Sequence, residues 1–197
     1  MKKYIYIIIV FTLNICYSQK ILIPMDNVQK DHLKAYGIAF HSLQQSNDIE
    51  WILNYRGGSF LLDDYADLQK ICTIRGVSFE IVDSQKLSEI LVTVEENNMD
   101  LVLLEKEPKI AVYSPPDKLP WDDAVTLVLT YAEIEYDVIF DDEVMGNELS
   151  KYDWLHLHHE DFTGQYGKFY KNYKNKSWYK KMELDFNNTA NRLGFNS

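Results

Sequence analysis

The chain has 197 residues, of which 46% are hydrophobic and 25% are charged, and its formal net charge is −10. This composition is typical of a globular protein with a sizeable core and excludes the disordered, collagen-like and low-complexity classes. The negative charge also argues against nucleic acid as a partner, because proteins bind phosphate backbones through Lys and Arg.

The N-terminus has the pattern of a secretory signal peptide. A positive start precedes an almost unbroken apolar run over residues 4–13, and Cys16 to Ser18 ends this run with small residues. The run is shorter than the roughly 20 residues of a membrane-spanning helix, so no stable membrane span is expected after cleavage. The bulky Ile15 before the cysteine argues against a lipoprotein signal. We expect an exported protein, periplasmic or extracellular, whose mature form starts near Gln19.

Signal cleavage would leave a single cysteine. Removal of residues 1–18 takes away Cys16 and two lysines, so 18 basic and 30 acidic residues remain, a net charge of −12. Cys72 then has no partner for an intramolecular disulfide, although an oxidising compartment would permit one. It lies on the apolar face of a predicted helix, which favours a buried small hydrophobe over a nucleophile.

The first part of the mature chain reads as alternating strands and helices. Strands are predicted over 20–23, 50–54, 77–82 and 100–104, and helices over 28–45, 61–74 and 85–97. This spacing suits crossover connections between parallel strands. We therefore expect a first α/β unit over residues 19–107.

A charged stretch closed by a proline, residues 105–108, marks a boundary, and the pattern then restarts. Strands are predicted over 109–113, 136–140 and 152–158, with helices starting at Pro120, over 143–150, and from a Ser177 cap to near Gly194. The second unit covers residues 108–197. The expected fold class is α/β, a doubly wound and mainly parallel sheet in two units.

Several stretches resemble one protein family. They are residues 36–39, 54–60, 109–113, 120–134 and 152–170. Together they are similar to exported Bacteroidota proteins commonly labelled asparagine synthetase B, which have a class I glutamine amidotransferase-like fold. The resemblance implies a flavodoxin-like or Rossmann-like doubly wound sheet. It also implies a longer protein, of which this chain is the N-terminal part.

The sequence lacks the motifs that an asparagine synthetase or a class I amidotransferase needs for catalysis. Lys2 follows Met1 where a synthetase needs a Cys nucleophile, the Ser-Gly-Gly-x-Asp-Ser loop is missing, and no Cys lies in a Gly-flanked elbow. No catalytic residue and no cofactor are identified. Three hypotheses stay open: amide or acyl chemistry by a longer protein, a non-catalytic envelope module that binds a ligand or a protein, and a metal-dependent hydrolase.

The polar run after the third strand of the second unit is the first candidate site. His158, His159, Glu160 and Asp161 lie at the carboxyl end of a predicted parallel strand, where open α/β sheets bind ligands. Imidazole and carboxylate are ligands for zinc or iron, so His159, Glu160 and Asp161 are also weak metal candidates. The alternative is that these side chains only hydrogen-bond a turn.

Two further loops follow predicted strands. Arg56, Gly57 and Gly58 provide a cation and accessible backbone N–H groups for an anion, although a plain turn explains the same residues. The acidic run 141–143 offers oxygens to a divalent cation, but acids are also common in the first turn of a helix.

Lysines and aromatic residues interleave over residues 166–181, with no acid among them. Such a stretch is either a solvated cationic face over an aromatic stripe or a contact for an anionic glycan or membrane surface. The partners expected for the whole chain are an unknown small molecule or envelope protein. Self-association is expected through an open sheet edge, because the second unit has only three predicted strands.

Overall fold

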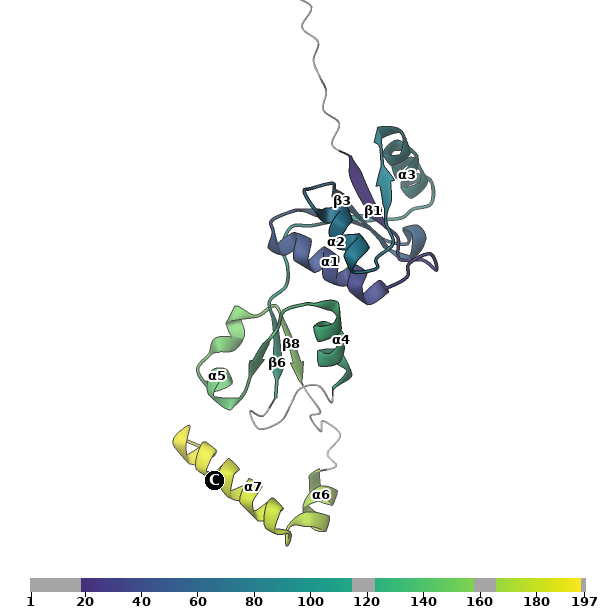
Figure 1. The fold of residues 1–197 in the computed structure, drawn as a ribbon. Helices are drawn as coiled ribbons and strands as arrows, with labels where there is room; N and C mark the ends of the chain where they lie inside the picture. The colour runs from purple at the N-terminus through teal and green to yellow at the C-terminus, as the bar shows by residue number, and fades with distance from the viewer. Residues whose placement is uncertain (1–18, 115–122, 158–165, 196–197) are drawn as a thin grey trace, which may run out of the picture. The chain divides into compact units, whose positions relative to one another are not determined.

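A computed structural model describes residues 19–114, 123–157 and 166–195 (Figure 1). The chain divides into two compact units between Glu105 and Lys106, and each is described by itself. Within the described ranges, none of the helices is both long enough and apolar enough to cross a membrane. The α/β class is confirmed, since helices and sheets occur in both units.

The first unit is built around a five-stranded sheet. Its elements are β1 (Lys20–Ile23), α1 (His32–Gln44), β2 (Ile49–Ile52), η1 (Tyr55–Gly57), β3 (Ser59–Asp63), α2 (Leu68–Ile74), β4 (Glu80–Val82), α3 (Ser84–Glu96) and β5 (Leu101–Leu104). The strand order is β4-β1-β3-β2-β5, and every neighbouring pair is antiparallel. The expectation of a parallel sheet is therefore wrong for this unit.

Helices cover both faces of this antiparallel sheet, which explains why its strands read like those of a parallel one. Ile21 and Ile23 of β1 pack with α1 and α2, whereas Leu22 packs with α3 on the opposite face. Strands buried on both faces are near-continuously apolar, a pattern more common in parallel sheets. The near-continuous apolar residues of these strands thus indicate burial on both faces of the sheet, and they do not indicate whether the strands are parallel or antiparallel.

The strand β3 is an element that the sequence analysis missed, as is the helix α6 of the second unit. Residues 61–63, predicted as the start of a helix, belong to β3, and α2 begins only at Leu68. Phe60, Leu61 and Leu62 are all at most 3% exposed, and a short apolar run of this kind fits a strand or a buried helix equally well. Because β3 lies between β1 and β2, it separates two strands that the prediction made neighbours.

The second unit contains a three-stranded parallel sheet. Its elements are β6 (Ile110–Tyr113), α4 (Ala124–Ala132), β7 (Asp137–Ile139), α5 (Asp141–Met145), η3 (Glu148–Lys151), β8 (Trp154–Leu157), α6 (Tyr166–Tyr173) and α7 (Ser177–Arg192). The order is β7-β6-β8, with both pairs parallel as predicted.

The two connections of this sheet run in opposite directions across it. The first leads through α4 to β7 at one edge, and the second leads from β7 through α5 to β8 at the other edge. Since strand-helix-strand crossovers share one handedness, the two helices lie on opposite faces of the sheet, as Figure 1 shows. Tyr113 pairs with Leu157 on one face, and Val112 pairs with His156 on the other.

Candidate functional site

The candidate site lies at the carboxyl ends of β6, β7 and β8, the edge at which open parallel sheets bind ligands. Each face of the sheet presents a different surface there. The α4 face carries buried polar groups, and the α5 face carries an apolar cavity.

On the α4 face, one carboxylate joins two elements. Oδ1 of Asp123 accepts a hydrogen bond of 2.8 Å from the backbone N–H of Val125 and so caps α4. Its other oxygen, Oδ2, lies 2.5 Å from Nε2 of His156 in β8. Asp123 is only 8% exposed, and both of its oxygens have these partners. The contact fixes the start of α4 against the carboxyl half of β8.

Ser114 directly follows β6 at the same edge. Its backbone N–H donates a hydrogen bond of 3.0 Å to the carbonyl of Ile139, which continues the ladder between β6 and β7. The side chain is fully buried, and its hydroxyl finds no hydrogen-bond partner among the described residues. Buried hydroxyl groups are normally satisfied. A hydrogen-bonding group is therefore expected beside Ser114, at the carboxyl end of the central strand.

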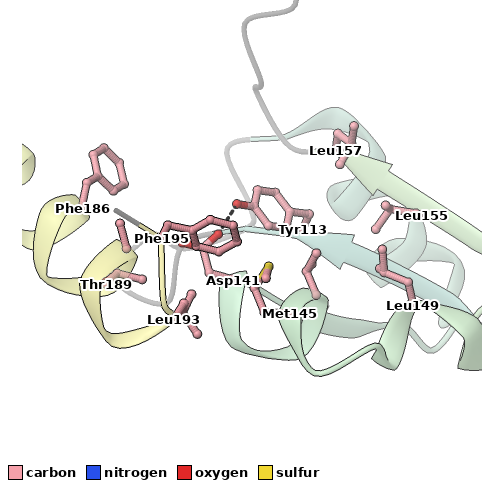
Figure 2. A pocket seen from close by; sticks show the side chains of 12 residues that line it. Tyr113, Asp141, Met145, Leu149, Leu155, Leu157, Phe186, Thr189, Leu193 and Phe195 are labelled. Carbon is pink, nitrogen blue, oxygen red and sulfur yellow. Dashed lines mark hydrogen bonds between the residues drawn. The ribbon is translucent and has the colours of Figure 1, made fainter. Parts of the chain in front are cut away.

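On the opposite face a cavity of about 480 Å³ opens beside α5 (Figure 2). This volume is in the range of small-molecule sites. Twelve residues line it: Tyr113, Asp141, Val144, Met145, Leu149, Leu155, Leu157, Phe186, Thr189, Ala190, Leu193 and Phe195. Nine of them are apolar, so the lining suits the apolar part of a ligand.

Two of the three polar residues that line the cavity, Tyr113 and Asp141, form a pair, and the third, Thr189, lies on α7. The phenol of Tyr113 donates a hydrogen bond of 2.6 Å to Oδ1 of Asp141, and Figure 2 shows Phe195 close to this pair. Tyr113 ends β6 and Asp141 begins α5 after β7, so both reach the cavity from the carboxyl edge of the sheet. An ionised carboxylate only accepts hydrogen bonds. The pair therefore favours a ligand that brings a donor.

The helix α7 forms the other wall of the cavity. Phe186, Thr189, Ala190 and Leu193 line it at the spacing i, i+3, i+4 and i+7, which places them on one face of the helix. Arg192 in the last turn contacts Asp142 of α5 at 2.6 Å. Both side chains of that pair are more than half exposed, so the pair contributes little to stability.

The polar run His158, His159, Glu160 and Asp161 lies outside the described residues, as does the predicted start of a helix at Pro120. Within the described ranges, no group of three or more His, Cys, Asp or Glu side chains is arranged to hold a metal ion.

The acidic run after β7 separates onto different partners. Asp141 accepts from Tyr113, Asp142 pairs with Arg192, and Glu143 accepts from the backbone N–H of Phe140 at 2.9 Å. These carboxylates do not converge on one point, and the run forms the first turn of α5. The position of these residues in the first turn of a helix therefore explains the acidic run without a bound cation.

In the first unit, Arg56 lies between two carboxylates. Its Nε donates to Asp26 at 2.8 Å, and its Nη1 lies 2.5 Å from Glu80. The hydrogen bond to Asp26 is the main reason that the pKa of Arg56 is raised, and it holds the pKa of Asp26 below its usual value. Gly57 and Gly58 follow with φ of 85° and 95°. In this structure Arg56 links the loop to its neighbours, which accounts for its charge without a bound anion.

Cys72 is buried in the core between the sheet and α2. Burial raises the pKa of its thiol to about 11, so the thiolate needed for nucleophilic attack is disfavoured. The interpretation of Cys72 as a small buried hydrophobe is confirmed.

The residues that the structure brings together at the site were mostly absent from the sequence analysis. Tyr113 and Asp141 are 28 positions apart, and Asp123 and His156 are 33 apart. One local signal was present: Tyr113 ends a predicted strand, and Asp141 directly follows another. Comparison of the chain with known protein families, with curated proteins and with solved structures gives no match.

Proposed function

We propose that the second unit is a non-catalytic binding domain for a small molecule with an apolar body and one hydrogen-bond donor, such as an amine or a hydroxyl. The cavity beside α5 carries this proposal. Its nine apolar lining residues receive the body of the ligand, and the Tyr113–Asp141 pair receives the donor.

The fold proposed for this unit is a doubly wound, amidotransferase-like sheet, in line with the family resemblance of the sequence. The order β7-β6-β8 and the position of α4 and α5 on opposite faces support it. In such sheets the crevice lies between two neighbouring strands whose connections run to opposite sides of the sheet. The strands β6 and β8 are these neighbours, and Tyr113 is the last residue of β6.

A binding role is favoured over amide or acyl chemistry by this chain. Class I amidotransferases need a reactive Cys, and the cysteine within the described residues, Cys72, is buried with a raised pKa. We therefore expect purified protein to neither hydrolyse glutamine nor form asparagine from aspartate and ATP.

Export is part of the same proposal and rests on the signal-peptide pattern. The backbone carbonyl of Gln19 accepts a hydrogen bond from Asp64 at 2.9 Å, and β1 begins at Lys20. Cleavage after Ser18 would leave these contacts in place. Intact-mass measurement on protein from the native host should give a chain that starts near Gln19, and an uncleaved Met1 start would contradict export.

Calorimetric titration with decylamine tests the cavity. The probe has a linear apolar body and one donor group, and decanoate is its matched acid. We expect decylamine to bind at least about tenfold more tightly, because the carboxylate of decanoate would face Asp141, a difference of about 1.4 kcal/mol. Equal binding of both probes would overturn the assignment of the donor site.

Two variants of α7 test whether decylamine binds in the cavity. Ala190→Trp places a large side chain in the cavity, whereas Asn188→Trp adds the same side chain at an exposed position two residues away. The first should lose decylamine binding and the second should keep it, with circular dichroism confirming that both fold. If both variants bind decylamine like the original chain, the cavity is not the binding site.

A further inference from the structure

The corner between α6 and α7 carries a concentrated positive charge on an acidic protein. Five exposed lysines with described side chains lie on it: Lys171, Lys174, Lys176, Lys180 and Lys181. No Asp or Glu occurs from residue 166 to residue 182, while the whole chain has a net charge of −10. We name these five lysines and the neighbouring Tyr170, Tyr173, Trp178 and Tyr179 the basic corner.

Helix stability does not explain the placement of these lysines. Lys176 is the N-cap of α7, Lys180 and Lys181 lie within its first five residues, and its first turn has no acid. The N-terminus of a helix carries a partial positive charge, so cations there are unfavourable and anions are favoured. A negatively charged partner would relieve this repulsion.

The aromatic side chains of the corner form one cluster around a buried ring. Tyr179 is 2% exposed and packs against Tyr170 and Trp178, with ring centroids 6.0 and 5.7 Å away. Trp178 also packs against Tyr173 at 5.4 Å. Trp178 nevertheless remains 47% exposed, and Tyr170 and Tyr173 are also exposed. The cluster therefore presents amphipathic rings to solvent beside the lysines.

The ring planes distinguish between kinds of anionic partner. Sugars and nucleobases stack on flat aromatic faces. Here the planes of Tyr170 and Tyr179 cross at 66°, those of Trp178 and Tyr179 at 72°, and those of Tyr173 and Trp178 at 49°, so the cluster forms no flat platform. Trp and Tyr with crossed planes and lysines around them suit the interface of a lipid bilayer, where one end of each ring is apolar and the other is hydrated.

We propose that the basic corner binds the surface of a membrane that contains anionic lipids. The lysines contact headgroup phosphates, and Trp178 enters the interfacial layer. This surface differs from the cavity beside α5, and the proposal does not depend on a ligand in that cavity. The protein would lie on the membrane at this corner.

Vesicle co-sedimentation of the full chain tests the proposal, with phosphatidylcholine vesicles and with the same vesicles containing phosphatidylglycerol. Binding should require phosphatidylglycerol and should weaken when salt is raised from about 0.1 M to about 1 M, because screening shortens the reach of the lysine charges. The double variant Lys171→Gln with Lys181→Gln should bind about 30-fold more weakly, since each basic residue near an anionic surface contributes about fivefold.

A matched control removes the same charge from another surface. Lys70 and Lys106 are exposed and lie outside the basic corner, so Lys70→Gln with Lys106→Gln should bind almost like the original chain. Residues 1–18 are identical in all variants, and any contribution from them cancels. Equal loss in both double variants would show a general charge effect and would overturn the proposal.

Trp178→Phe provides a readout of insertion that does not depend on affinity. The original chain should show a blue shift of tryptophan fluorescence on anionic vesicles, and Trp178→Phe should still bind but lose most of that shift. A full blue shift in this variant would place the membrane contact elsewhere. Binding to dextran sulfate without binding to anionic vesicles would overturn the proposal in favour of an anionic polysaccharide.

Discussion

Asp123 and His156 are joined by a contact of 2.5 Å between Oδ2 and Nε2, across 33 positions of the chain. The same carboxylate caps α4 through Val125. A single side chain thus sets both where α4 begins and where it meets β8. On the other face of the sheet, the hydrogen bond between Tyr113 and Asp141 joins β6 to α5 in a similar way.

Removal of the Asp123 side chain should destabilise the second unit. Asp123→Ala loses the cap of α4 and leaves His156 without this partner, so we expect the free energy of unfolding to fall by about 1–3 kcal/mol. Asp123→Asn keeps a capping oxygen and should cost less. Urea unfolding followed by hydrogen exchange of peptides from residues 123–157 measures both. Asp185→Ala on the exposed side of α7 is the control, and an equal midpoint for Asp123→Ala and this control would contradict the prediction.

The fold of the second unit could be predicted more fully than that of the first, for a physical reason. Each of its strands is followed by a helix, so the neighbours in its sheet follow from short crossover connections. In the first unit, β3 enters between β1 and β2, and the edge strands β4 and β5 lie at opposite ends of the sheet. These pairings depend on contacts distant in sequence, which periodicity does not contain.

The same limit applies to the site. The sequence pointed to the carboxyl edge of β8 through a polar run that lies outside the described residues. The cavity on the α5 face instead takes its second wall from α7, whose Phe186, Ala190 and Leu193 read as an ordinary amphipathic stripe. Helical spacing indicates that such residues share a face. It does not indicate that the face lines a cavity.

Gly57 should be intolerant of a side chain. Its φ is 85°, and a Cβ at this position would lie 2.3 Å from the backbone oxygen of Met25. The close approach follows from the hydrogen bond of 3.0 Å between the Met25 N–H and the Arg56 carbonyl. Gly57→Ala should cost about 2–4 kcal/mol, the sum of backbone strain and steric overlap.

Gly76 offers the matched control for that substitution. Its φ is 71°, but no atom lies within 4 Å of a Cβ built there. Gly76→Ala should therefore cost only the backbone strain, about 1–2 kcal/mol. Urea unfolding, with hydrogen exchange of peptides from residues 20–63 as the readout, compares the two. An equal loss of unfolding free energy in the two variants would show that the backbone of Met25 moves to accommodate the added Cβ, and would contradict the prediction.

The pair of Asp26 and Arg56 should make the first unit sensitive to acid. The hydrogen bond from Arg56 lowers the pKa of Asp26 below its ordinary 3.8 in the folded state. The stabilisation is then fully present above the ordinary value and is lost as pH falls through the lower folded-state pKa. Asp26→Asn should lower the urea midpoint at neutral pH, and its difference from the original chain should shrink below about pH 4. A difference that stays constant through that range would contradict the ionic role of Asp26.

Self-association should occur through an exposed strand edge, and one edge of each sheet is a candidate: β8 in the parallel sheet and β5 in the antiparallel sheet. In the part of the chain that the structure describes, β8 pairs with β6 on one side alone, and β5 pairs with β2 on one side alone. Trp154 of β8 is 43% exposed and Val102 of β5 is 38% exposed. Apolar edges with unpaired backbone groups are templates for association, and a lysine on such an edge opposes it.

Trp154→Lys and Val102→Lys separate these two edges. Because β8 belongs to a sheet of only three strands, we expect its edge to dominate, so Trp154→Lys should shift the protein toward monomer while Val102→Lys leaves association nearly unchanged. Sedimentation velocity over a range of protein concentrations measures this shift, at a salt concentration high enough to screen the added charge. A larger shift toward monomer in Val102→Lys than in Trp154→Lys would instead assign association to the antiparallel sheet of the first unit. A monomer at every concentration for the original chain would contradict association through β8 and through β5, and the net charge of −10 would then be sufficient to prevent it.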